Sequence, residues 1–272
     1  MLSFDRPVQH ITSRQNPIVA RYRAARERKA ECDPILLDGV HLVREGLAAL
    51  RPLCDVVVAA GAVDRAEIRG LIAQLARNHV DVRTAAPAVM AALSPVRSPS
   101  PIVALTSAPE LHGGAVYQRL FAGERPLVVV GYNIQDPGNV GAIVRVAEAA
   151  GATGFDVGTN SADPFGWKAV RASMGSVLRL PVAGDTNLGL DAARRRGCRI
   201  FALVPDGGRS PFDVDLRGPA AIMIGGEGAG LPAGLEDASD EKITIPMQPP
   251  VESLNAAVSA AVVLYEARRQ RS

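Results

Sequence analysis

The stretch from Asn133 to Arg145 constrains this chain more than any other part of the sequence. It reads N-I-Q-D-P-G-N-V-G-A-I-V-R, and it joins the apolar run 127–130 to a helix-like run. Asp136-Pro137-Gly138 is typical of a turn, and Asn139 is a good helix N-cap. An ordinary strand-to-helix turn therefore explains part of the motif. It does not explain why Asn133 and Arg145 accompany the cap.

The composition favours a globular protein with two domains. The chain has 272 residues, of which 47% are hydrophobic and 21% are charged. The formal net charge is only +2, but residues 14–29 hold six basic residues and the single acid Glu27. Such a segment is either a phosphate-binding face or the solvated face of a helix. The six are Arg14, Arg21, Arg23, Arg26, Arg28 and Lys29.

Cysteine and histidine do not form a recognisable metal pattern. Cys32, Cys54 and Cys198 are too few and too scattered for a disulfide framework or a cysteine zinc site, and no histidine has ligand spacing with them. We expect reduced thiols and no metal. The N-terminus lacks an apolar secretory core, and no uncharged apolar segment approaches the ~20 residues that cross a bilayer. We therefore expect a cytoplasmic protein without a membrane span.

The first 107 residues alternate between strand-like and helix-like segments, which predicts a compact α/β/α domain. Residues 108–124 contain Pro109 and Gly113-Gly114 and are expected to be a linker. The expected strands are 35–37, 55–59, 80–82 and 102–106, and the expected helices are 40–50, 64–78 and 87–93.

Residues 125–272 show a second alternation, which predicts a mostly parallel sheet with helices on both faces. A ligand of such a sheet lies at the carboxyl ends of the strands. The expected strands are 127–130, 154–157, 200–204, 220–224 and 243–245, and the expected helices follow Asn139 and cover 168–173 and 253–269.

A glycine-rich loop follows the expected strand 220–224. It reads G-G-E-G-A-G-L-P from Gly225 to Pro232, and closely spaced glycines let backbone amides approach a ligand. A tight turn and a phosphate cradle are the alternatives. The lysine of a phosphate loop is missing, and Glu227 in the centre would repel an anion, which argues against a phosphotransferase.

A third motif runs from Ile245 to Asn255 and reads I-P-M-Q-P-P-V-E-S-L-N, before an alanine-rich helix. Ser253 can cap that helix, which leaves Asn255 to point at a ligand or at another motif. A solvent-facing Asn255 is the simpler alternative.

With these three motifs in order, the chain resembles the SpoU (TrmH) family of the SPOUT superfamily, which are S-adenosylmethionine-dependent RNA ribose 2'-O-methyltransferases. The matches span residues 133–261, and D-P-F-G-W-K-A-V-R-A-S-M-G at 163–175 is similar to the family's stretch between the first two motifs. Residues 1–107 more loosely resemble a substrate-binding domain similar to RNA-binding ribosomal proteins.

The resemblance implies an α/β fold with a C-terminal trefoil-knot domain at 125–272, in which the last segment threads through a preceding loop. It also implies a cofactor pocket for S-adenosylmethionine built from the second and third motifs. The implied cofactor residues are Leu203, Gly225, Gly226, Glu227, Gly228, Ile245, Met247, Ser253, Leu254 and Asn255.

The implied reaction is displacement at the sulfonium methyl by a ribose 2'-hydroxyl. Arg145 matches the arginine often assigned as general base in the family, but a guanidinium with a pKa above ~12 is a poor base. Two roles therefore stay open for Arg145, which are base and phosphate anchor. We expect Asn139 to orient Arg145 or the ribose, with Asn133 in support. The remaining catalytic candidates are Ser253, Asn255 and Glu227.

The resemblance also implies a homodimer in which one subunit's Arg145 faces the other's cofactor site, with the helix 253–269 at the interface. We expect RNA as the partner and favour rRNA because of the N-terminal extension, with a tRNA 2'-O-methyltransferase as the alternative within the same class. A non-catalytic RNA-binding protein that keeps the knot is the alternative from another class. The candidate RNA contacts are Arg14, Arg21, Arg23, Arg26, Arg145 and Arg171.

Overall fold

The computed structural model describes residues 9–228 and 230–272, without the side chains of residues 186–188. Its contacts divide the chain into two compact units. Unit 1 contains the chain up to Pro109 together with Phe165–Leu178, and unit 2 contains Glu110–Pro164 and Arg179–Ser272. The division by function into an RNA-binding domain and a methyltransferase domain stays a prediction.

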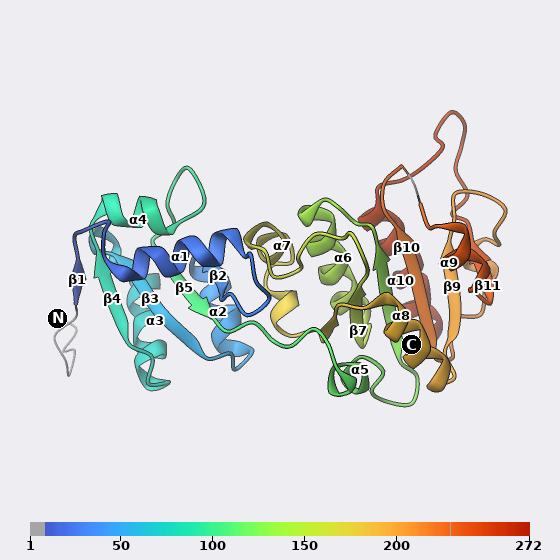
Figure 1. The fold of residues 1–272 in the computed structure, drawn as a ribbon, viewed down its shortest axis with the longest axis horizontal. Coiled ribbons are helices and arrows are strands. Elements are labelled where there is room, and N and C mark those ends of the chain that lie inside the picture. Colours follow the sequence, from blue (N-terminus) through green and yellow to red (C-terminus); the bar gives the residue numbers. More distant parts are fainter. Residues whose placement is uncertain (1–8, 229) are drawn as a thin grey trace. The chain divides into compact units, whose positions relative to one another are not determined.

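Unit 1 is built on a mixed five-stranded sheet in the order β1-β4-β3-β5-β2 (Figure 1). β4 pairs parallel with β1 and β3, and β5 pairs antiparallel with β2 and β3. The strands are β1 (His10–Ile11), β2 (Ile35–Asp38), β3 (Leu53–Ala59), β4 (Val82–Ala85) and β5 (Ile102–Thr106). The helices are α1 (Pro17–Glu27), α2 (Val40–Ala48), α3 (Ala66–Arg77), α4 (Pro87–Leu93) and α7 (Trp167–Ala172), with 3-10 turns η1 (Ala60–Ala62) and η2 (Ser176–Leu178).

The basic N-terminal segment forms the amphipathic helix α1. Asn16 caps it by accepting a hydrogen bond from the Ile18 amide, and Pro17 starts the first turn. One face buries Ile18, Val19, Tyr22 and Ala25, and the arginines occupy the exposed face. The apolar spacing thus fixes α1 to the sheet and leaves its cations in solvent.

Unit 2 is built on a six-stranded sheet in the order β11-β9-β10-β6-β7-β8, and every strand pair is parallel. This confirms the predicted α/β fold with a mostly parallel sheet, and the trefoil knot stays a prediction. The strands are β6 (Leu127–Tyr132), β7 (Gly154–Val157), β8 (Val182–Ala183), β9 (Arg199–Leu203), β10 (Ala220–Gly225) and β11 (Glu241–Ile243). The helices are α5 (Gly114–Leu120), α6 (Pro137–Ala150), α8 (Thr186–Arg195), α9 (Ala233–Asp237) and α10 (Ala256–Arg271), with the 3-10 turn η3 (Pro211–Asp213).

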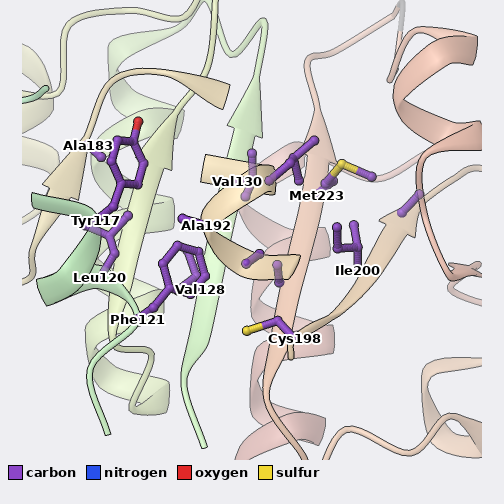
Figure 2. Packing of buried hydrophobic residues seen from close by; sticks show 14 of the residues in the cluster. Tyr117, Leu120, Phe121, Val128, Val130, Ala183, Ala192, Cys198, Ile200 and Met223 are labelled. Atoms are coloured by element: carbon purple, nitrogen blue, oxygen red, sulfur yellow. The ribbon is translucent and has the colours of Figure 1, made fainter. Parts of the chain in front are cut away.

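The helices α5 and α8 pack on one face of this sheet. Figure 2 shows Phe121, at the end of α5, near Val128 of β6, and Tyr117 of α5 beside Ala183 of β8; Met223 of β10 belongs to the same buried cluster. Residues 108–124, which we expected to be a linker, therefore supply a helix to the core of unit 2. The helices α6 and α10 pack against each other and contact β7 and β10.

Two helix starts differ from the sequence-based expectation. Asp136, not Asn139, caps α6, because its Oδ1 accepts a hydrogen bond from the Asn139 amide at 3.0 Å. Asn255, not Ser253, caps α10, since its Oδ1 accepts from the Ala257 and Val258 amides at 2.9 and 3.3 Å. Proline at N1 of α6 places the cap one residue before it. The expected strands 80–82 and 243–245 are shifted by about two residues, to β4 and β11.

None of the helices in the described ranges is long and apolar enough to cross a membrane. Among the same residues, no group of three or more His, Cys, Asp or Glu side chains is arranged to hold a metal ion.

Candidate active site

The carboxyl ends of β6, β9, β10 and β11 lie along one edge of the parallel sheet, so the loops that follow them meet there. A cavity of about 440 Å³ opens between three of these loops. It lies after β9, around the glycine loop that follows β10, and along the segment from β11 to α10. The cavity thus lies at the carboxyl ends of the strands, where a ligand was predicted.

All ten residues that the sequence assigned to a cofactor line this cavity. The structure thus brings together residues from Leu203 to Asn255 that three separate loops supply. The sequence analysis did not assign six further residues that line the cavity. Each of them lies beside or inside a segment that was assigned, which was the signal available for finding them. These are Val204, Pro205, Ile224, Gly230, Ala256 and Ser259.

Two glycines of the second motif are required by close backbone contacts. A Cβ on Gly226 would lie 1.9 Å from the carbonyl oxygen of Asn133, and one on Gly225 would lie 2.2 Å from the carbonyl carbon of Gly230. No side chain fits at these distances. The glycine loop is therefore folded against the first motif, where Asn133 takes the left-handed conformation with φ of 55°.

Asn139, Glu227 and Asn255 form one hydrogen-bonded network that joins the three motifs. The Glu227 Oε1 accepts from Asn139 Nδ2 at 2.8 Å and from Asn255 Nδ2 at 2.7 Å. Asn255 Nδ2 also donates to Asn139 Oδ1 at 3.0 Å. Glu227 and Asn255 are exposed, and Asn139 is half-buried. The carboxylate thus holds two amides from segments far apart in the sequence.

Asn255 uses both ends of its side chain. Its oxygen caps α10, and its amide nitrogen reaches Glu227 and Asn139. Because the cap fixes the side chain at the first turn of the helix, the start of α10 is tied to the glycine loop. This double use answers why an amide stands at this position rather than a serine.

Arg145 lies apart from the network. It is six positions after Asn139 on α6, which is about 240° around a helix, so the two side chains leave different faces. Arg145 is exposed, does not line the cavity, and has no hydrogen bond or ion pair with any residue that the structure describes. No described hydrogen bond joins Asn139 to Arg145 within one chain, and the expectation that Asn139 orients Arg145 or the ribose stays a prediction. Ser253 is exposed and lines the cavity.

The other candidate RNA contacts lie in unit 1. Arg21 forms an ion pair with Asp55, whose other oxygen accepts from Arg83 Nη1 at 3.0 Å. Arg14, Arg23 and Arg26 are exposed, and no described residue forms an ion pair with them. Arg171 lies on α7 near Asp38, a carboxyl whose pKa is raised by burial. Of the candidate RNA contacts on α1, Arg21 is thus already paired with a carboxylate of the protein.

Comparison with known proteins identifies the family. The model of the SpoU rRNA Methylase family matches residues 126–265, which is more than half of the chain. The chain belongs to the SpoU rRNA methylase family. A tRNA/rRNA methyltransferase of Synechocystis sp., described as uncharacterized, is 30% identical over 97% of this chain and 95% of its own length. The predicted family, and with it the class of RNA methyltransferases, is confirmed.

The similarity to a named methyltransferase and to a solved structure covers almost the whole chain of this SpoU family member. The 23S rRNA (guanosine(2553)-2'-O)-methyltransferase RlmP of Bacillus subtilis is 26% identical over 96% of this chain and 100% of its own. The SpoU methyltransferase AviRb from Streptomyces viridochromogenes, solved in complex with AdoMet, is similar with a TM-score of 0.82 and 28% identity. The likeness covers 94% of this chain and 98% of that chain.

Proposed function

We propose that this protein transfers the methyl group of S-adenosylmethionine to a ribose 2'-hydroxyl of rRNA. The observation that carries the proposal is the cavity at the carboxyl edge of unit 2, around which all ten predicted cofactor residues lie. The names of the relatives support the reaction, since RlmP is a 2'-O-methyltransferase of 23S rRNA and AviRb binds AdoMet.

The residues around the cavity fit this cofactor. The volume of about 440 Å³ is in the range of ligand sites, roughly 300–1,000 Å³. Leu203, Ile245 and Leu254 offer apolar surface that suits an adenine ring, and the glycine loop offers backbone groups at close range. When bound, S-adenosylmethionine supplies a methyl group on a sulfonium that a hydroxyl oxygen can attack.

The protein's own groups position the reactants. Glu227 holds Asn139 and Asn255 in one geometry, and both amides stand next to the cavity. With the cofactor bound, the ribose oxygen would take its methyl group, the neutral thioether would be the leaving group, and the hydroxyl proton would pass to water. Alignment of this kind supplies a large part of the rate enhancement. We assign Arg145 to the RNA, where its planar guanidinium binds a phosphate and stabilises the nucleophile.

Arg145 reaches the reacting groups from a second copy of the chain. Its position outside the cavity supports this proposal, because one chain alone leaves the arginine without a role. An exposed apolar stripe on α10, with Val258 at 49% and Tyr265 at 51% exposure, supplies a surface for a homodimer. Sedimentation at micromolar concentration should give the dimer mass, and a monomer mass would contradict the proposal.

Mixed dimers test where Arg145 acts. Arg145→Ala and Asn255→Ala homodimers should each lose methyl transfer, and mixing the two should restore up to one intact site per mixed dimer. Restoration is expected only if Arg145 and Asn255 of one site come from different copies. No recovery on mixing, with exchange of subunits verified by mass, would place Arg145 on its own chain's site.

The reaction itself is tested with labelled S-adenosylmethionine and separated rRNA and tRNA pools, followed by mapping of 2'-O-methyl groups. We expect label in the rRNA pool with the wild type and at least a hundredfold less with Arg145→Ala, since a group that acts on the transition state is lost. Label in tRNA alone would favour the tRNA alternative. RNA binding without any transfer would favour a non-catalytic RNA-binding protein.

We propose that unit 1 draws RNA in through the exposed face of α1. The double variant Arg23→Gln/Arg26→Gln should weaken RNA binding and lower the slope of log affinity against log salt by about 1 to 2. Arg69→Gln/Arg77→Gln, with two exposed arginines on α3 of the same unit, is the matched control. An equal loss in both variants would refute a specific role for α1. Cytoplasmic localisation stays a prediction.

A further inference from the structure

The loop that follows β9 closes around the end of β11. Val204 donates its amide to the Ile243 carbonyl at 2.9 Å as the chain leaves β9. Further along, Arg209 donates its amide to the Lys242 carbonyl, and Thr244 donates its amide to the Arg209 carbonyl, both at 2.9 Å. The loop 204–209 therefore begins and ends on the same short stretch of β11.

The Thr244 hydroxyl joins both ends of this loop through a single atom. Its oxygen accepts from the Gly208 amide at 2.9 Å and donates to the Val204 carbonyl at 3.2 Å. A hydroxyl is a donor and an acceptor at once, so it can satisfy both backbone groups. Valine has the same shape and can satisfy neither.

Gly208 stands where the two backbones are closest. A Cβ at this position would lie 2.7 Å from the carbonyl carbon of Ile243 and 2.8 Å from the amide nitrogen of Thr244. These are backbone atoms that cannot rotate away as a side chain can. Glycine is therefore needed for the loop to reach the Thr244 hydroxyl.

An ion pair also holds the loop 204–209 to β11. Glu241 of β11, whose side chain is 13% exposed, accepts from Arg209 Nη1 at 2.8 Å and from Arg199 Nη2 at 2.5 Å. Arg199 belongs to β9 and Arg209 to the loop. The loop is thus held by this ion pair as well as by the Thr244 hydroxyl.

The residues next to these contacts are walls of the cofactor cavity. Val204 and Pro205 line it after β9, and Ile245 and Met247 line it after β11. We propose that Thr244 is a positioning residue that sets the spacing of these two walls for the adenosine part of the cofactor. This proposal rests on the proposed function only in its choice of cofactor.

The test compares Thr244→Val with Thr244→Ser by calorimetric titration with S-adenosylmethionine in the absence of RNA. Loss of both hydrogen bonds should raise the dissociation constant about fivefold to thirtyfold in Thr244→Val. Thr244→Ser keeps the hydroxyl and should stay within about twofold of the wild type. In methyl transfer, Thr244→Val should raise KM for the cofactor and leave kcat and KM for RNA nearly unchanged.

Hydrogen exchange gives a readout that does not depend on activity. The Gly208 amide should exchange faster in Thr244→Val than in the wild type, and Thr244→Ser should restore its protection. Gly208→Ala should weaken cofactor binding at least as much as Thr244→Val, because its Cβ meets backbone. Gly218→Ala is the matched control, since Gly218 also lies in the connection from β9 to β10 and its Cβ would meet nothing within 4 Å.

An unchanged dissociation constant in Thr244→Val would overturn the proposal. So would an equal loss in Thr244→Val and Thr244→Ser, because the hydroxyl would then not be the cause. A fall in kcat without a change in KM would also overturn it, since that indicates general damage. Failure of the proposed function would show differently, as wild-type protein that binds S-adenosylmethionine and methylates no RNA.

Discussion

Two of the places in unit 2 where polar side chains tie distant segments together differ in exposure. The network of Asn139, Glu227 and Asn255 joins α6, the glycine loop and α10, and its carboxylate is exposed and hydrogen bonded. The second place, which we term the α8 anchor, consists of Asp156, Asp185 and Tyr117. Asp156 is fully buried, and one of its carboxylate oxygens has no hydrogen-bond partner among the described residues.

The contacts of the α8 anchor connect β7 to the start of α8 and to α5. Asp156 Oδ1 accepts from the Asp185 amide at 3.1 Å, and the Tyr117 hydroxyl donates to the Asp185 carbonyl at 2.8 Å. A Cβ on Gly189 would lie 1.8 Å from Asp156 Oδ2, so the glycine in α8 makes room for the carboxyl. Burial raises the pKa of Asp156 to about 7.

The difference in exposure predicts that the network affects function and the α8 anchor affects stability. A solvated network can change its protonation or partners at little cost to folding, because water satisfies what is lost. A buried carboxyl cannot lose a partner at little cost, because no water is present to replace the lost hydrogen bond. We therefore expect substitutions in the network to act on methyl transfer and substitutions in the α8 anchor to act on the free energy of unfolding.

The largest expected effect is on the pH dependence of folding. A carboxyl whose pKa is raised in the folded state stabilises the fold below its unfolded pKa, near 4, and this contribution is lost as the pH rises through about 7. The wild-type free energy of unfolding should fall by on the order of 4 kcal/mol from this group. Asp156→Asn should remove that fall, measured by urea unfolding between pH 4 and pH 8.

The control for this variant is Asp191→Asn, an exposed carboxylate on α8 itself. It should leave the pH profile of unfolding as in the wild type. Cofactor binding by Asp156→Asn at pH 7 should stay within about twofold, because the α8 anchor does not line the cavity. An unchanged fall in stability in Asp156→Asn would mean that other groups cause it.

The next effect concerns the glycine loop beside the network. Gly226→Ala places a methyl group 1.9 Å from the Asn133 carbonyl oxygen, so the loop must move and Glu227 with it. We expect cofactor binding to weaken about a hundredfold, equivalent to about 3 kcal/mol. Gly234→Ala is the control, because its Cβ would meet nothing within 4 Å. Equal binding by both variants would show that the loop adapts.

The sequence allowed the cavity to be predicted but not the contacts around it. Leu203 could be assigned because it ends a recognisable strand, and Gly226 and Met247 because they stand in motifs of the family. The sequence predicted that Asn255 points at a ligand or at another motif, and its amide does reach Glu227 and Asn139. The residues that it meets could not be derived, since Asn139 and Asn255 are 116 residues apart and only the folded chain brings them together.

Other errors had local causes that the sequence contains. The segment that forms helix α5 looks like a linker in the sequence because Pro109 and Gly113 precede it, Gly114 begins it, and its seven residues are too few to show a helical period. The expectation that Asn139 orients Arg145 or the ribose stays a prediction, and the spacing of six places the two side chains on different faces of the helix. The α8 anchor could not be predicted, because the burial of a single carboxyl produces no recognisable pattern in the sequence.

A smaller effect is expected within the network itself. Glu227→Gln keeps one oxygen acceptor and replaces the carboxylate charge by an amide, so the hydrogen bonds from Asn139 and Asn255 weaken. We expect kcat/KM for methyl transfer to fall about tenfold, equivalent to about 1.4 kcal/mol. The free energy of unfolding should stay within about 0.5 kcal/mol. A larger loss of stability than of activity would contradict the separation of the two places.

The smallest effect returns to the α8 anchor. Tyr117→Phe removes the hydroxyl that donates to the Asp185 carbonyl and keeps the buried ring that packs in the core of unit 2. The loss of one such hydrogen bond should cost about 1 kcal/mol of unfolding free energy. Methyl transfer should be unchanged, because Tyr117 does not line the cavity. Should activity fall in Tyr117→Phe while stability holds, the α8 anchor would take part in function, and exposure would no longer separate the two places.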